Sequence, residues 1–248
     1  MVRKPGPFGQ KVFNLIIYYD KMIMENYPKL GSGSEYYKKL DAYVDSSGFK
    51  FCLEDQLTIS EFKEIIPSVT IEKMADCHFC DREHVSINLK KNGEPSKTQK
   101  VVIDGPNFID DLVIFKGVDK SWSDNSAEWL YCIAFDEHIV KIGQTITSLK
   151  ERYVSYACGD RKARLEGTCS VTNFIVCEAV YAALLLGHRA EIFGIRVPKK
   201  TVTETFAGAT RNVTYSVVRD YEEILTDRFI EHTGHIPVLC VQKGDSTS

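Results

Sequence analysis

WLYCIAFDEHIVKIGQTITSLKERYVSYACG, residues 129–159, is the stretch of sequence that decides the fold. Two runs rich in apolar and β-branched residues stand on either side of the turn-like pair Asp136 and Glu137, and this pattern predicts a β-hairpin. Ser148 and Glu151 then form a capping box, which predicts the start of a helix. The stretch therefore predicts a strand, a turn, a second strand and a helix in succession.

The rest of the chain predicts two regions. The polar run SWSDNSAE, residues 121–128, breaks the periodicities of both strand and helix, and we place the boundary there. Residues 1–120 read as a mixed α/β region, and residues 121–248 hold the hairpin. Further predicted elements are a helix after the capping box of Thr58 and Glu61, helices at 172–186 and 218–232 that end at glycines, and a hairpin within TVTETF and NVTYSV.

The hairpin and its helix carry residues suited to phosphodiester hydrolysis. That reaction needs a nucleophile, a group that takes its proton, and positive charge on the phosphoryl oxygens. Tyr131 on the first strand can take a proton from water if neighbouring cations stabilise tyrosinate, because free tyrosine has a pKa of about 10. Lys141 on the second strand can supply such charge. Arg152 can donate two parallel hydrogen bonds to a phosphate, although a surface pair with an acidic neighbour is the alternative.

A glutamate on the last predicted helix completes the set. Helical spacing aligns Glu222 with three apolar positions, Val218, Leu225 and Phe229. Its carboxylate is therefore expected to point inward, where it needs a partner. Mg²⁺ accepts one or two carboxylates while keeping several waters, so a magnesium ion is one such partner. An ion pair with Arg152 or Lys141 is the alternative.

These residues occur in an order that resembles the GIY-YIG nuclease superfamily. The order is Tyr131, the tripeptide Lys-Ile-Gly from Lys141, Arg152, the run GTCSVTN and Glu222. The resemblance is greatest to small Type II restriction enzymes with lysine in the second tripeptide, and it covers the C-terminal half of the chain. In those enzymes a histidine follows the tripeptide directly. Here Gln144 stands instead, and an amide can orient a water but cannot accept its proton.

The resemblance implies both a fold and a function. The implied fold is α+β, with a small three-stranded antiparallel sheet flanked by helices in residues 121–248. The implied function is that of a site-specific Type II restriction endonuclease that hydrolyses double-stranded DNA as a homodimer on a palindromic site. Tyr131 would be the general base and Glu222 the ligand of Mg²⁺, with Lys141, Arg152 and Gln144 in the same site. The alternatives are a repair or homing nuclease of the superfamily, and a DNA-binding protein of this fold without turnover.

The charge of the chain limits how it can hold DNA. With 31 basic and 34 acidic residues, its net charge is −3, which argues against binding through bulk charge alone. A local positive cleft can coexist with an acidic exterior. Two basic clusters are candidates, and a solvated loop is the alternative for each. Together with residues around GTCSVTN, the predicted DNA contacts are Tyr156, Arg161, Lys162, Arg164, Thr168, Ser170, Asn173, Lys199 and Lys200.

One cysteine cluster has the spacing of a metal site. Cys77 and Cys80 form a CxxC pair, His84 follows, and Cys52 can act as a fourth ligand of structural Zn²⁺. Ordinary reduced cysteines in a small core are the alternative. The sequence has no apolar run of about 18 residues and no apolar signal-like segment at its start, so we expect a cytoplasmic protein without a membrane span.

Overall fold

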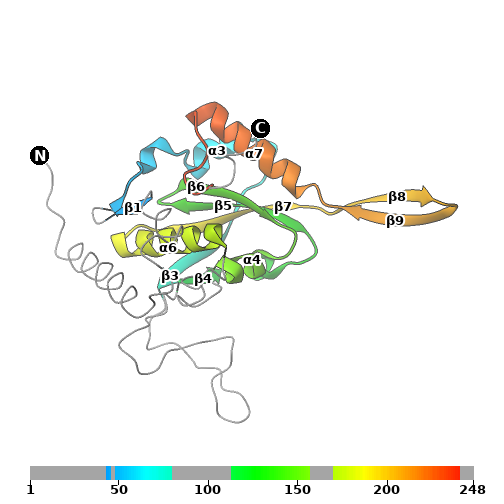
Figure 1. Cartoon of the computed structure of the whole chain (residues 1–248), viewed down its shortest axis with the longest axis horizontal. Helices are drawn as coiled ribbons and strands as arrows, with labels where there is room; N and C mark the ends of the chain where they lie inside the picture. Colours follow the sequence, from blue (N-terminus) through cyan, green and yellow to red (C-terminus); the bar gives the residue numbers. More distant parts are fainter. Residues whose placement is uncertain (1–42, 46–47, 80–112, 157–169, 241–248) are drawn as a thin grey trace, which may run out of the picture. The chain divides into compact units, whose positions relative to one another are not determined.

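The computed structural model describes residues 43–45, 48–79, 113–156 and 170–240, which Figure 1 draws as ribbon. These residues fall into two compact units. One unit holds Cys52–Cys77, Phe115–Ser155 and the described residues from Arg189 onward, and the other holds the remaining described residues. Tyr131, Lys141, Arg152 and Glu222 all belong to the first unit.

The central element is a five-stranded sheet with the order β4-β3-β7-β5-β6. Its strands are β3 (Glu72–Phe79), β4 (Val113–Gly117), β5 (Glu128–Phe135), β6 (His138–Thr145) and β7 (Ala190–Val197). β7 runs antiparallel to both β3 and β5, and β5 runs antiparallel to β6. The predicted α+β class is confirmed, but the sheet has five strands where three were predicted.

The two additional strands come from the region before residue 121. β7, β5 and β6 are the three strands that residues 121–248 contribute, and β3 pairs with the outer edge of β7. Without β3, that edge would present unpaired N–H and C=O groups. The predicted boundary between 1–120 and 121–248 thus lies between β4 and β5, two strands of one sheet, and the division into two domains stays a prediction.

The β5–β6 hairpin forms where the sequence predicts it. Its turn residues, Asp136 and Glu137, both have positive φ values, of 46° and 73°. Positive φ at both central residues is the geometry of the two-residue hairpin turn whose twist matches that of the strands, and aspartate tolerates it well. The register then pairs Phe135 with His138 and continues to Trp129 and Thr145.

One face of the sheet forms the hydrophobic core with two helices. Leu130, Cys132 and Ile142 point to this face, and they pack with α3 (Ile59–Ile65) and α7 (Val218–Thr233). α3 begins at Thr58 with the predicted capping box. α7 contributes the buried residues Leu225 and Phe229. Burying a leucine or phenylalanine side chain contributes about 1.5–3 kcal/mol, so α7 is firmly attached to this face.

The other face carries an aromatic cluster centred on Tyr153 of α4 (Leu149–Tyr156). The ring of Tyr153 lies 5.0 Å from that of Phe115 and 5.3 Å from those of Trp122 and Tyr131, centroid to centroid. Trp122 belongs to η4 (Lys120–Ser123). Tyr153 and Leu149 are fully buried. This packing fixes α4, and with it Arg152, over the first residues of the hairpin.

Between β7 and α7 the chain forms a separate two-stranded ribbon, β8 (Lys200–Phe206) and β9 (Ala209–Tyr215). The hairpin predicted there is confirmed. Ala207 and Gly208 form the turn with positive φ values of 50° and 79°. Figure 1 shows the ribbon extending well beyond the sheet and α7.

The remaining described elements are short, apart from one helix. α6 (Val171–Leu186) begins at Ser170, whose hydroxyl accepts a hydrogen bond from the backbone N–H of Asn173, and ends at Gly187 with φ of 88°. This matches the helix predicted at 172–186. The others are β1 (Val44–Asp45), β2 (Gly48–Phe49) and η2 (Leu53–Asp55). Among the described residues, no helix is long and apolar enough to cross a membrane.

Candidate active site

Tyr131 lies at the centre of the candidate site, on β5. Its partner on β6 is Gly143, and its partner on β7 is Gly194. A Cβ atom at Gly143 would come within 2.5 Å of both the Cζ and the hydroxyl oxygen of Tyr131. The tyrosine ring therefore lies directly over the backbone of β6, which is the outermost strand of the sheet. Gly143, the glycine of the Lys-Ile-Gly tripeptide, has no side chain, and this leaves space for the Tyr131 ring to extend toward the edge of the sheet.

Arg152 approaches the same hydroxyl group from α4. Its Nε donates a hydrogen bond of 3.1 Å to the hydroxyl oxygen of Tyr131. Its Nη1 donates to the Oγ of Ser155 at 3.4 Å, and that hydroxyl donates to the backbone oxygen of Arg152 at 2.6 Å. The guanidinium is thereby oriented toward the tyrosine. This hydrogen bond places Arg152 beside Tyr131, and its role in binding a phosphate stays a prediction.

Lys141 adds a second positive charge on this face. It is opposite Ile133, so strand alternation puts it on the same face as Tyr131 and Gly143. The residue is only 7% exposed, and within the described part of the chain its ammonium forms no hydrogen bond and no ion pair. Such a group is suited to an anionic ligand.

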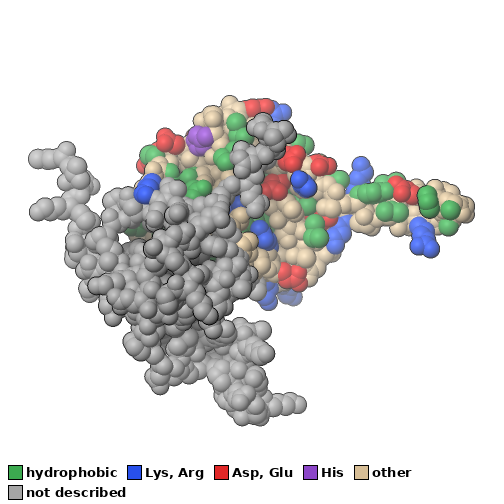
Figure 2. Space-filling model, viewed as in Figure 1, with side chains coloured by type: hydrophobic (Ala, Val, Ile, Leu, Met, Phe, Trp, Pro, Cys, Tyr) green, Lys and Arg blue, Asp and Glu red, His purple; other side chains and the backbone are tan. Residues whose placement is uncertain are grey.

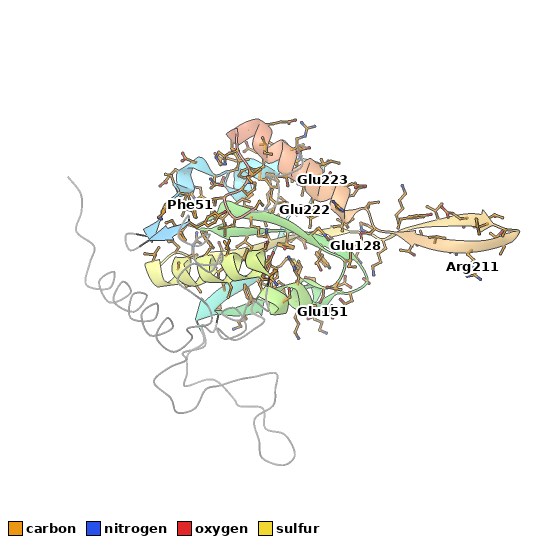
Figure 3. All side chains as sticks on the ribbon, viewed as in Figure 1. Phe51, Glu128, Glu151, Arg211, Glu222 and Glu223 are labelled. Carbon is orange, nitrogen blue, oxygen red and sulfur yellow. The ribbon has the colours of Figure 1, made fainter. Side chains whose placement is uncertain are left out.

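Glu222 is half-buried on α7, whereas Glu223 is exposed. Glu223 instead lies 3.9 Å from the Nε of Arg219, as expected for the wet side of the helix. The partial burial of Glu222 agrees with the predicted inward direction, and its role as a metal ligand stays a prediction. Because α7 packs on the core face through Leu225 and Phe229, however, it approaches the sheet from the side opposite to Tyr131. Figure 3 labels Glu222 and Glu223 on α7.

Gln144 also points to the face that α7 covers. It is paired with Leu130, and alternation along β6 directs it away from Tyr131. Its Oε1 is fully buried and has no hydrogen-bond partner among the described residues. The structure thus brings together Tyr131, Lys141 and Arg152 on one face of the hairpin. It places Gln144 and the helix of Glu222 on the other face.

β6 is the edge strand of the sheet beside β5, and α7 contacts both strands. Among the described residues, no group of three or more His, Cys, Asp or Glu side chains could hold a metal ion. A site built from few protein ligands is nevertheless what Mg²⁺ prefers, since it keeps several of its waters. The carboxylate of Glu222 and the unpartnered amide oxygen of Gln144 are hard oxygen donors of the appropriate chemistry.

The predicted DNA contacts fall in different places. Lys199 and Lys200 are exposed, and the Nζ of Lys199 donates to the backbone oxygen of Asn125 at 3.3 Å. Ser170 and Asn173 form the first turn of α6, and Tyr156 is buried with 1% of its surface exposed. Arg161, Lys162, Arg164 and Thr168 lie outside the described residues. Contact of any of these residues with DNA stays a prediction.

The predicted zinc site is only partly within the described residues. Cys77 is buried on β3, whereas Cys80 and His84 lie outside the described residues. Cys52, the suggested fourth ligand, is exposed, and its thiol donates to the Oε2 of Glu54 at 2.7 Å. That hydrogen bond raises the pKa of the Cys52 thiol. Structural zinc therefore stays a prediction.

The ribbon and the additional sheet strands are the features near the site that sequence reasoning did not assign to function. The buried and unpartnered state of Gln144 Oε1 was also missed, because burial of one amide atom depends on α7, which lies far away in the sequence.

Comparison with known proteins gives distant likenesses. No family model matches the chain, and no curated protein matches its sequence. Among solved structures, the chain is similar to restriction endonuclease HPY188I in complex with product DNA, with a TM-score of 0.42 and 20% identity over 82% of this chain and 95% of that chain. It is also similar to a mutant of bacteriophage T4 EndoII, with a TM-score of 0.36 and 17% identity over 68% of this chain and 94% of that chain.

Proposed function

We propose that this chain is a metal-dependent endonuclease of the GIY-YIG type that cuts double-stranded DNA at specific sites, as Type II restriction enzymes do. One observation carries the proposal. A tyrosine hydroxyl accepts a hydrogen bond from Arg152 beside the largely buried Lys141, which lacks a partner among the described residues. A site with two cations around one hydroxyl is suited to bind a phosphodiester and to stabilise tyrosinate.

In this proposal, Tyr131 takes the proton of the attacking water. Lowering the pKa of a tyrosine from about 10 to about 7 requires about 4 kcal/mol of stabilisation of the tyrosinate. The Nε of Arg152 at 3.1 Å and the ammonium of Lys141 on the same face supply charge for this purpose. The same two cations bind the phosphoryl oxygens, where negative charge accumulates in the transition state.

Mg²⁺ would be held by Glu222, with Gln144 as a second oxygen donor at the edge of β6. A bound Mg²⁺ supplies charge for the phosphoryl oxygen and the leaving group. Gln144 can orient a water through its amide but cannot take a proton. Acceptance of the proton therefore depends on Tyr131 alone, and we expect slower turnover than in an enzyme with histidine at this position.

A DNA-binding protein of the same fold without turnover is the second candidate. The observation that favours it is Gln144, whose amide replaces a base. A repair or homing nuclease of the superfamily would keep the chemistry and change the target.

Incubation of the purified protein with phage DNA and Mg²⁺ separates these functions. Discrete fragments are expected for the site-specific enzyme, and a smear would indicate a non-specific nuclease. Intact DNA together with a gel shift would contradict the enzymatic proposal and support the binding protein. We also propose that two copies act on a two-fold symmetric site. Sedimentation of the protein with a duplex that contains the selected site should give two chains per duplex.

A further inference from the structure

The β8–β9 ribbon is exposed along its whole length, apart from the half-buried Val213. An isolated two-stranded hairpin is only marginally stable in water, so a ribbon of this kind needs its own cross-strand support. It has such support in the pairs Val202 with Val213 and Glu204 with Arg211. The hairpin is stabilised by its own cross-strand pairs and packs little against the sheet, so its surface is available to bind another molecule.

One face of the ribbon is polar and uncharged. On this face, three cross-strand pairs of residues are each joined by a hydrogen bond between their side chains, with donor–acceptor distances of 3.2, 2.8 and 2.9 Å. The pairs are Thr201 with Thr214, Thr203 with Asn212, and Thr205 with Thr210. A threonine hydroxyl has one donor and two acceptor positions, and an amide has more, so each pair retains capacity for further hydrogen bonds. We call these six residues the threonine face.

The opposite face of the ribbon is largely apolar, with Val202, Val213 and Phe206, and the basic residues lie at the base of the ribbon and on β9. Lys199, Lys200 and Arg211 are basic, and Glu204 is acidic but is paired with Arg211 and accepts a hydrogen bond from Tyr215. The whole chain, by contrast, has a net charge of −3. Figure 2 shows blue Lys and Arg side chains on the ribbon, and in Figure 3 the labelled Arg211 extends away from it. The ribbon is therefore a local site of positive charge on an acidic protein.

We propose that the ribbon is a DNA-reading arm, whose threonine face contacts base edges in the major groove. This inference rests on the proposed function, because double-stranded DNA is the substrate of that function. The major groove, about 12 Å wide, admits a two-stranded β-ribbon. Threonine and asparagine are side chains that read base edges there. Phe206, 86% exposed at the tip, lies on the opposite face together with Arg211.

The dimensions and connections of the ribbon agree with this role. Strands of seven residues extend about 24 Å, which exceeds the groove depth of about 8.5 Å. Lys200 and Arg211 are then available to phosphates on either side of the groove, which fix position without reading sequence. β8 follows β7, whose Gly194 pairs with Tyr131, and β9 leads into α7, which carries Glu222. The ribbon, which would read the sequence, is thus directly connected along the chain to the two elements β7 and α7 that belong to the proposed cleavage site.

The test removes hydroxyl groups from the threonine face without changing the shape of the ribbon. Thr203→Val and Thr205→Val are combined in one variant, because valine keeps the β-branched side chain. The matched control combines Val202→Thr and Val213→Thr on the opposite face. Each full-length protein is incubated, without divalent metal, with a library of randomised duplexes, and the bound DNA is sequenced. Cleavage of phage DNA in Mg²⁺ is measured in parallel.

The wild-type protein is expected to enrich a defined sequence. The threonine-face variant should lose at least about tenfold of this preference, while the control keeps it. A variant that retains the preference would overturn the inference, and so would a wild-type protein that enriches no sequence. A change in the number of chains in the free protein, without a change in preference, would show that the ribbon joins two copies and would also overturn it. Absence of cleavage by the wild type contradicts the proposed function instead, since the binding assay does not depend on cleavage.

Discussion

Arg152 and Tyr131 are joined by a hydrogen bond of 3.1 Å from the guanidinium Nε to the phenol oxygen, and this bond connects α4 to β5, the first strand of the hairpin. It holds a permanent positive charge against the atom that becomes negative in tyrosinate. The chemical role that we propose for the hydroxyl group can therefore be tested separately from the structural role of the buried ring.

Tyr131→Phe should reduce DNA cleavage by about 10²- to 10⁴-fold, which is the usual contribution of a general base. Stability should change little, because one hydrogen bond contributes about 1 kcal/mol and the ring remains. Cleavage rates and thermal unfolding measure the two effects. Tyr153→Phe is the matched control, since Tyr153 packs against Tyr131 at 5.3 Å and has no assigned role in the reaction. Equal losses in both variants would contradict the role of Tyr131.

Gly143→Ala should remove activity by displacing the tyrosine ring. Its Cβ would lie 2.5 Å from the hydroxyl oxygen of Tyr131, which real contacts do not permit. Gly194→Ala is a useful comparison, because its Cβ would meet the Cγ of Met74 at 2.7 Å and the Cδ1 of Leu149 at 3.0 Å. Overpacking costs about 1–3 kcal/mol in either case. Cleavage, corrected for the folded fraction, should fall only in Gly143→Ala.

Lys141→Met should leave the stability of the protein unchanged and make it less active. Lys141 is 7% exposed, and its ammonium has no partner among the described residues, so an apolar side chain of similar length keeps the packing and breaks no ion pair. Cleavage should be lost, because a cation for the phosphate is lost with it. The midpoint of thermal unfolding and the cleavage rate are the measurements. Lys150→Met, on the exposed side of α4, should change neither. A fall in stability for Lys141→Met would show that the ammonium is paired in the folded protein.

Local features of this fold were predictable from the sequence, and long-range features were not. The β5–β6 turn was predicted because Asp136 and Glu137 are adjacent to the strands they join. The inward direction of Glu222 followed from helical spacing alone. The pairing of β3 with β7 was missed, because it joins residues near 75 to residues near 192, and EKMADCHF has no alternation that identifies its partner.

The same distinction applies to the candidate site. Tyr131, Lys141 and Arg152 were grouped by motif, and they do share one face of the hairpin. The separation of Gln144 from them follows from strand alternation once the register is known. The exposure of the β8–β9 ribbon was not predictable, because alternating runs such as TVTETF resemble strands with one buried face.

Thr58→Ala should destabilise α3 by about 1 kcal/mol near neutral pH, and less in acid. The backbone and side-chain hydrogen bonds from Thr58 hold the pKa of Glu61 below its ordinary value of 4.5. A lowered pKa in the folded state means that this carboxylate stabilises the fold above its ordinary pKa. The contribution is lost as the pH falls through the lower, folded-state value. The difference in stability between wild type and variant should therefore become smaller as the pH falls below 4.5, while the part due to the bond from the Glu61 N–H to the Thr58 hydroxyl remains. A constant difference would contradict the role of ionised Glu61.

Glu222→Gln should reduce cleavage at least about a hundredfold, because loss of metal charge at a phosphoryl group is worth several kcal/mol and each 1.36 kcal/mol is tenfold. DNA binding in the absence of metal should be unchanged. Glu223→Gln is the matched control, since Glu223 is the adjacent carboxylate, is exposed and lies near Arg219. If both substitutions leave cleavage intact, neither carboxylate of α7 holds the metal. If only Glu223→Gln abolishes cleavage, the ligand lies on the exposed side of α7, and the half-buried position of Glu222 reflects packing alone. If only Glu222→Gln abolishes cleavage, the carboxylate of Glu222 is the one that acts in the reaction. Because α7 contacts β6, the edge strand, this carboxylate would then act near the edge of the sheet, where the core face and the face of Tyr131 adjoin.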